Sequence, residues 1–418
     1  MARWNWGVLA IAFVGSLPLA ACSHLHLTQN PHQVIARTGD YDNFDDYRKA
    51  PDDHSRAGPV AARVLPYAVL AEQSEASKVY ERGKAAPQPR ACLGDESVPC
   101  DKADLDRDER RANNLLGRWR LISTCDGPEK CNTDSPHGLG RVDGLGVQIW
   151  VSRGAICREA IIAFRGTVPG SVGDWVSNFH WFIRALPVYD QYDQVRDNIG
   201  RFVDEITKLD CFRDPGTRIV TLGHSLGGGL AQIAAYADPR VRRIYAFDPS
   251  PVTGYYSGGL TNRDANVAGL RSERIYEHGE ILAYLRYFAR QFVPPTPCDP
   301  RIVNLRFDLL HGSPLDQHGI GDFTSALLRE SRNDASERDP IVDRSCPAGA
   351  QRASRGSENI SAATHVPFSG ASGRFQSLAM SFSVTCGIGA GSARTGWGGA
   401  RRATGGVGGA SRAGRNPW

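Results

Sequence analysis

This chain of 418 residues lacks cysteines and histidines at the spacing of metal ligands, although it contains 10 cysteines and 11 histidines. No Cys-x-x-Cys pair occurs, and no group of cysteines and histidines has the spacing of a zinc site. The chain also lacks a long apolar stretch near its start, since Val8 to Ala21 falls short of the roughly 20 residues that a membrane-spanning helix needs. We therefore expect neither a metal ion nor another cofactor, and we do not expect this stretch to span a bilayer.

The first 21 residues have the pattern of an export signal. Arg3 supplies a short positive region, the apolar stretch follows, and the segment ends in Leu19-Ala20-Ala21-Cys22. This ending resembles the lipobox of bacterial lipoproteins, in which the cysteine is lipidated and becomes the mature N-terminus. The resemblance implies a protein exported and lipid-anchored in the bacterial envelope through Cys22, with Ser23 favouring the outer membrane. The alternative is an ordinary secretory signal cut near Ala21.

Nine cysteines remain when Cys22 is set aside, an odd number for an exported protein. Cys92 with Cys100, and Cys125 with Cys131, are close enough in sequence to close short loops by disulfides. The sequence does not determine the other pairings.

Lysine is absent from residues 345–418, a segment with eight arginines, fifteen glycines and a single acidic residue, Glu358. Such a composition buries too little apolar surface to offset chain entropy, so we expect 336–418 to be a disordered tail. In an exported protein we do not expect this basic tail to bind nucleic acid. Residues 22–112 are polar, apart from an apolar stretch at Val60 to Leu70, and predict a tether followed by a loosely structured cap. The folded domain is predicted at 113–335.

Within that domain, strand and helix patterns alternate. Short apolar runs predict strands, and apolar residues at helical spacing predict amphipathic helices between them. This alternation predicts an α/β fold, a mainly parallel sheet with helices on both faces. The expected strands are 147–151, 160–164, 218–222, 243–247, 274–276 and 301–307, and the expected helices are 189–209, 226–237 and 322–330.

Gly223-His224-Ser225-Leu226-Gly227 lies between an expected strand and an expected helix. Strand, tight turn and helix are the context in which a G-x-S-x-G motif forms a nucleophile elbow. The two outer glycines are needed because the sharp turn leaves no room for side chains two positions from the serine. The helix N-terminus favours an anion forming beside the serine. We therefore predict Ser225 as a nucleophile.

Three segments together resemble the class 3 (fungal-type) lipases of the α/β-hydrolase fold: Ala163-Phe164-Arg165-Gly166-Thr167, then Asp174-Trp175 with Asn178, then Gly223 to Gly228. The resemblance covers about 113–332. It implies an oxyanion hole formed by the backbone N–H of Leu226 and by Thr167, opposite an ester carbonyl attacked by Ser225.

The α/β-hydrolase order is serine, acid, histidine. For the base, His318 is favoured over His311, because it directly precedes the last helix and follows a loop long enough to reach the elbow. For the acid, Glu280 stands where the family usually carries an aspartate. Its rival is Asp248, which ends the strand after the elbow helix in a segment resembling pancreatic-type lipases.

These residues predict a serine hydrolase that cleaves carboxylic esters through an acyl-enzyme. The resemblance implies lipids as substrates, triacylglycerol or phospholipid, at the bacterial envelope. One alternative is an envelope acyltransferase or phospholipase with the same triad. Another is a non-catalytic lipoprotein that binds lipid or a partner, which the intact elbow motif argues against. The sequence leaves the oligomeric state open.

Overall fold

The computed structural model describes residues 32–38, 54–75, 102–126, 131, 145–166, 190–212, 216–255, 260, 262–288 and 300–332. Several sequence expectations lie outside them: the signal peptide, Cys22, the Cys92–Cys100 pair, Thr167, the 174–178 segment and the tail.

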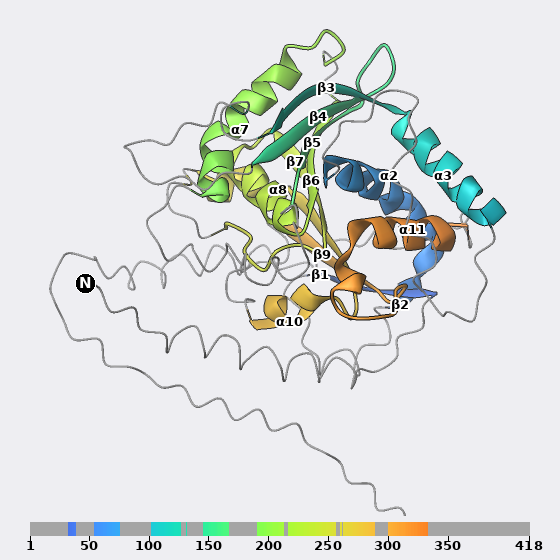
Figure 1. The fold of residues 1–418 in the computed structure, drawn as a ribbon. Coiled ribbons are helices and arrows are strands. Elements are labelled where there is room, and N and C mark those ends of the chain that lie inside the picture. The colour runs from blue at the N-terminus through green and yellow to red at the C-terminus, as the bar shows by residue number, and fades with distance from the viewer. Residues whose placement is uncertain are drawn as a thin grey trace, which may run out of the picture. The chain divides into compact units, whose positions relative to one another are not determined.

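Within the described residues, nine strands form one sheet in the order β2-β1-β9-β8-β7-β6-β5-β4-β3 (Figure 1). The five central strands run parallel: β5 (Glu159–Phe164), β6 (Arg218–His224), β7 (Val241–Phe247), β8 (Arg271–Glu277) and β9 (Arg301–Phe307). Both edges are antiparallel, with β4 (Gly146–Ser152) and β3 (Trp119–Asp126) on one side and β1 (Gln33–Thr38) and β2 (His54–Arg56) on the other. The predicted parallel sheet is therefore correct for the centre, and the edges make the sheet mixed.

Helices cover both faces of this sheet, as the strand–helix alternation predicted. On one face lie α7 (Gln191–Thr207) and α8 (Leu226–Ala237). On the other lie α2 (Ala57–Glu75), α3 (Lys102–Leu116) and α11 (Ile320–Glu330) (Figure 1). The shorter elements are α9 (Arg263–Val267), α10 (Ile281–Phe288) and the 3₁₀ turn η6 (Asp316–His318).

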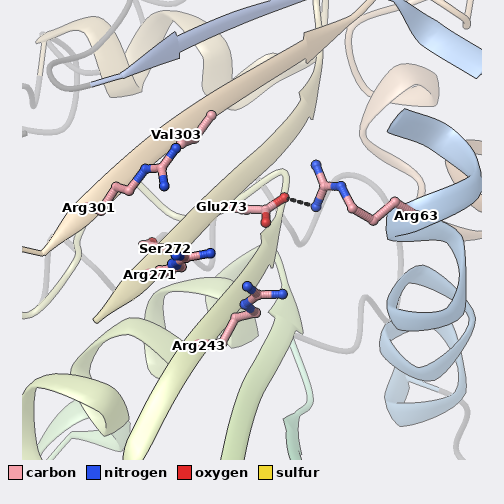
Figure 2. A pocket seen from close by; sticks show the side chains of 7 residues that line it. All are labelled: Arg63, Arg243, Arg271, Ser272, Glu273, Arg301 and Val303. Carbon is pink, nitrogen blue, oxygen red and sulfur yellow. Dashed lines mark hydrogen bonds and ion pairs between the residues drawn. The ribbon is translucent and has the colours of Figure 1, made fainter. Parts of the chain in front are cut away.

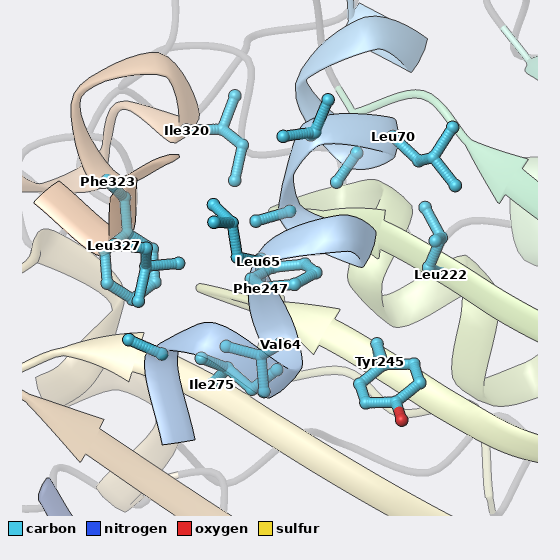
Figure 3. Packing of buried hydrophobic residues seen from close by; sticks show 14 of the residues in the cluster. Val64, Leu65, Leu70, Leu222, Tyr245, Phe247, Ile275, Ile320, Phe323 and Leu327 are labelled. Carbon is cyan, nitrogen blue, oxygen red and sulfur yellow. The ribbon is translucent and has the colours of Figure 1, made fainter. Parts of the chain in front are cut away.

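The core on the α2 face is built from alternate residues of the central strands. Tyr245 and Phe247 of β7 belong to this cluster, whereas Ile244 and Ala246 belong to the cluster beneath α8. Leu65 of α2 packs into the α2 cluster, where side chains of α11 also lie (Figure 3). Each fully buried large apolar side chain contributes about 1.5–3 kcal/mol. Burial on both faces is why these strands are continuous apolar runs.

The predicted start of the folded domain near residue 113 is wrong. Helix α2 is buried against the sheet and α11, and β1 pairs antiparallel with β9, with Ile35 opposite Arg306. Residues 33–38 and 54–75 are thus part of the core, not a tether or a loose cap. The apolar stretch Val60 to Leu70 lies within α2, where it covers a sheet face that would otherwise be exposed.

Two disulfides fix the region around β3, β4 and β5. The predicted Cys125–Cys131 pair is confirmed. A second bridge, Cys157–Cys211, joins the turn before β5 to the segment that follows α7 and closes a sequence separation of 54 residues. Among the described helices, none combines the length and the apolar character that crossing a membrane requires.

Candidate active site

Ser225 lies at the turn between β6 and α8, at the carboxyl edge of the parallel strands. Its backbone has φ 54° and ψ −121°, a conformation that residues other than glycine rarely adopt and that costs on the order of 1–3 kcal/mol. Neighbouring backbone holds it there: the Ser225 N–H donates to Phe247 O over 2.9 Å, and Ser225 O accepts from the Ser250 N–H over 2.8 Å. The turn is therefore a strained elbow, stabilised from β7 and the loop after it.

The glycines of the elbow are required by close backbone contacts. A Cβ on Gly223 would lie 2.3 Å from the carbonyl carbon of Gly227, and a Cβ on Gly227 would lie 2.3 Å from Phe164 O. Both distances are far inside van der Waals contact. The sequence argument for these two positions is therefore confirmed.

His318 and Glu280 lie in direct contact. The Nδ1 atom of His318 lies 2.7 Å from Glu280 Oε2, and both side chains are buried, at 8% and 0% exposure. His318 ends the η6 turn, whereas Glu280 lies between β8 and α10. The alternative base His311 is exposed in the same loop. The structure thus pairs the histidine and the carboxylate favoured by the sequence.

Two further donors hold the Glu280 carboxylate. Oε2 also accepts from the Leu282 N–H over 2.7 Å, and Oε1 accepts from Arg286 Nη2. Arg286 is itself buried, donates to Pro249 O over 2.9 Å, and lies 4.5 Å from the ring centroid of Tyr276. Burial alone would raise the pKa of Glu280, but Arg286 and the hydrogen bond from His318 outweigh it and lower this pKa. Glu280 is therefore ionised at neutral pH.

An ionised Glu280 fixes the tautomer of His318. A carboxylate can only accept, so Nδ1 of His318 carries the proton and Nε2 carries the lone pair. Burial lowers the pKa of His318, and the positive charges of His224 and Arg286 lower it further. Glu280 raises this pKa, but the net shift is downward. The imidazole is thus neutral at pH 7, the state that a general base needs.

The rival acid, Asp248, has a different environment. Its Oδ1 accepts from the Glu277 N–H over 3.0 Å, and its Oδ2 lies 3.9 Å from His224 Nε2. Burial and the negative charge of Glu280 raise the pKa of Asp248 well above its usual range. Asp248 therefore binds the end of β8 through the Glu277 N–H, and the carboxylate in contact with His318 is Glu280.

His224, the residue before the serine, links the elbow to the loop of His318. Its Nδ1 lies 2.6 Å from Glu75 Oε1 at the end of α2, and its Nε2 lies 2.8 Å from the backbone oxygen of His318. A carbonyl only accepts, so Nε2 is protonated. Burial lowers the pKa of His224, but Glu75 and Asp248 raise it to about 9. His224 is therefore an imidazolium that donates to both partners.

The backbone of Leu226 and of Gly166 lies next to Ser225, on the side where an oxyanion would form. Leu226 is the first residue of α8, so its N–H has no acceptor within the helix and is available to an anion. Gly166 lies beside the elbow, because a Cβ on it would lie 2.8 Å from His224 O and 3.6 Å from Ser225 Cβ. Thr167 follows Gly166 directly but is outside the described residues.

The same residues also have the composition of a metal site. Possible ligand atoms of His224, Asp248 and His318 lie within 4.8 Å of one another. A histidine ligand needs a lone pair, and both ring nitrogens of His224 face hydrogen-bond acceptors. This set therefore fits a hydrogen-bonded cluster better than a metal centre.

Two residues that contact the site, Glu75 and Arg286, were not predicted from the sequence. Glu75 belongs to a segment that sequence reasoning placed in the cap, and Arg286 belongs to a helix without a recognisable motif. Neither carries a local signal, because each acts through a contact that only the fold creates.

No family model and no curated protein sequence matches this chain. Solved structures similar to it are lipases and esterases. Lipase II from Rhizopus niveus is 14% identical over 62% of this chain and 79% of its own, with a TM-score of 0.33. The lipase from Rhizopus microsporus var. chinensis is 15% identical over 54% and 69%, with a TM-score of 0.32. An esterase from the archaeon Pyrobaculum calidifontis is 16% identical over 66% and 96%, with a TM-score of 0.29. These likenesses are distant and do not assign a function to this chain.

Proposed function

We propose that this chain is a serine hydrolase of the α/β-hydrolase fold that cleaves carboxylic esters through an acyl-enzyme. The observation that carries the proposal is the contact between His318 and the ionised Glu280 at the sheet edge where Ser225 occupies a strained elbow. A neutral histidine oriented by a buried carboxylate, and a serine at a helix N-terminus, are the parts that activate a hydroxyl for acyl transfer.

The reaction would proceed in two halves. Nε2 of His318 takes the Ser225 hydroxyl proton as Oγ attacks the ester carbonyl, and the oxyanion lies at the N–H of Leu226 and at Thr167. His318 then donates that proton to the departing alcohol, which leaves an acyl-serine. Water, deprotonated by His318, hydrolyses this ester and restores Ser225. One oxyanion-hole donor is generally worth about 3–4 kcal/mol.

We propose lipids, triacylglycerol or phospholipid, as the substrates. The support is the resemblance of the elbow, the 163–167 segment and the 174–178 segment to class 3 lipases. The proposed location is the bacterial envelope, where an acylated Cys22 would bring the site to a lipid surface. Acyl chains contribute about 0.8 kcal/mol for each buried CH₂, so several chains anchor a protein stably.

Hydrolysis of p-nitrophenyl esters of graded chain length tests both parts of the proposal. We expect turnover that rises toward longer chains and disappears in Ser225→Ala. Ser250→Ala is the matched control, since Ser250 contacts the elbow through its backbone N–H and keeps that bond. Equal activity of Ser225→Ala and wild type would refute the nucleophile, whereas a preference for the shortest chains would refute lipid substrates alone.

An acyltransferase or phospholipase with the same residues is the second candidate. It is separated from a simple hydrolase by the acceptor, because a transferase forms a new ester when an alcohol or a lyso-lipid competes with water. The non-catalytic alternative predicts no turnover with any ester and no covalent reaction at Ser225.

The proposed anchor has its own test. Wild type expressed with its leader should partition into detergent and carry an acylated Cys22, whereas Cys22→Ser should stay aqueous or unprocessed. An unmodified mature N-terminus in the mass spectrum of wild type would refute the lipoprotein assignment and leave the hydrolase proposal intact.

A further inference from the structure

Three arginines form a row across the central sheet, at the end opposite Ser225. Arg271 and Arg301 are the first residues of β8 and β9, and Arg243 is the third residue of β7. In the sheet register Arg243 lies opposite Arg271, and Arg271 lies opposite Arg301. Neighbouring strands are about 4.8 Å apart, so three side chains of one charge stand side by side on one face.

This row lines a pocket beneath helix α2. Arg63 of α2 forms the facing wall, and Glu273 lies between the row and Arg63, with which it forms an ion pair (Figure 2). The pocket, including the open space at its mouth, is about 380 Å³. Four arginines against one glutamate leave the lining with three positive charges in excess.

Such a row is costly when nothing compensates it. Like charges directly opposite each other on neighbouring strands destabilise a sheet. Glu273 is engaged by Arg63, and Arg243 donates to the Tyr245 hydroxyl over 3.0 Å, a neutral partner. The crowding is also visible at Arg301, whose pKa is lowered by burial, Arg271 and Arg243, although the negative charge of Glu273 opposes this shift. An anion bound across the row would remove this repulsion.

We propose that this pocket binds a phosphate group. A carboxylate offers two oxygens and is satisfied by a single guanidinium, whereas a phosphate monoester offers three oxygens and up to two negative charges. Three adjacent guanidinium groups with an excess of three charges match the larger anion. The arginines lie at the start of β7, β8 and β9, whereas the proposed catalytic residues follow the ends of strands, so this site is separate from the ester-cleaving site.

The phosphate can come from two sources, a free or small phosphorylated molecule or the headgroup of an acidic phospholipid. Both present the same oxyanion to the row. We expect Arg271 to contribute most directly, because it is the exposed, central member of the row. Removal of one charge-assisted contact of this kind weakens binding by about tenfold or more.

Calorimetric titration of the full chain with sodium phosphate, against sodium chloride at equal ionic strength, tests the proposal. We expect binding in wild type and a Kd raised about tenfold or more in Arg271→Gln. Arg271→Lys should have an intermediate Kd, because it keeps the charge but loses the planar guanidinium that binds phosphate through two N–H groups. Arg242→Gln is the matched control: this exposed arginine on β7 donates to Ala268 O and does not line the pocket. It should bind phosphate as wild type does.

Two further measurements complete the test. In chloride, Arg271→Gln should melt at the same temperature as wild type or above it, because repulsion in the row is relieved. Flotation with phosphatidylcholine vesicles, with and without phosphatidic acid, identifies the source: Arg271-dependent binding to the acidic vesicles assigns a headgroup, and its absence assigns a free phosphate. Equal Kd values for wild type, Arg271→Gln and Arg242→Gln, or no phosphate-dependent heat in wild type, would overturn the site. None of these outcomes depends on whether the chain hydrolyses esters.

Discussion

Replacing Glu280 by glutamine removes two roles that the structure gives this carboxylate. As the partner of His318 Nδ1, it fixes the tautomer and stabilises the imidazolium that forms during reaction. As the partner of Arg286, it neutralises a guanidinium that is only 2% exposed. The amide keeps the shape of the side chain and removes its charge, so both roles are lost together.

The two losses affect different quantities, the turnover number and the free energy of unfolding. In serine proteases the corresponding amide substitution lowers kcat by about 10⁴-fold, and we expect a loss of this order. Breaking a buried ion pair by removing one partner costs about 3–5 kcal/mol. Arg286 retains its bond to Pro249 O and its contact with the Tyr276 ring, so we expect the lower end of that range.

A double variant distinguishes the roles. In Glu280→Gln/Arg286→Met the uncompensated cation is gone, so chemical denaturation should show much of the lost stability recovered. Ester hydrolysis should stay at the level of Glu280→Gln. Asp248→Asn is the matched control, because the carboxylate on His318 is Glu280 and the amide oxygen still accepts from the Glu277 N–H; we expect less than a tenfold loss of kcat.

Activity that returns together with stability in the double variant would refute a catalytic role for Glu280. It would also be refuted by a folded Glu280→Gln variant within tenfold of wild type. In either case Glu280 would be only a structural ion pair. A dead but stable Asp248→Asn, with Glu280→Gln active, would assign the acid to the end of β7.

Two further predictions follow from contacts around the elbow. The pKa of His224 is raised from 6.5 to about 9, so its contribution to stability is fully present below pH 6.5 and is lost as pH rises through 9; urea unfolding should show this slope in wild type and not in Glu75→Gln. Gly227→Ala should prevent folding because its Cβ would meet Phe164 O. Gly200→Ala in α7, with no neighbour nearer than 3.8 Å, should raise the free energy of unfolding by about 0.5–1 kcal/mol.

Local pattern was sufficient for the elements around the elbow. Helix α8 begins and ends where its apolar spacing predicted, and β6 extends the predicted strand by two residues to His224. The elbow glycines were predictable because their steric requirement arises from residues close in sequence or from one neighbouring strand.

Long-range contacts limited the rest. Strand β1 pairs with β9 across some 270 residues of sequence, and α2 contains Pro66 in its interior, where a helix is not expected from sequence, so neither was recognised as core. The same limit applies to the site. Nothing in the sequence indicates that Glu75 would bind His224, because this contact depends on where α2 ends against the sheet.

The central claim is that Ser225 is the nucleophile, and covalent labelling tests it most directly. Wild type treated with a fluorophosphonate and digested should give one modified peptide, with the added mass on Ser225, and a folded Ser225→Ala should give none. A label on another residue of wild type, or equal labelling of Ser225→Ala, would contradict the account.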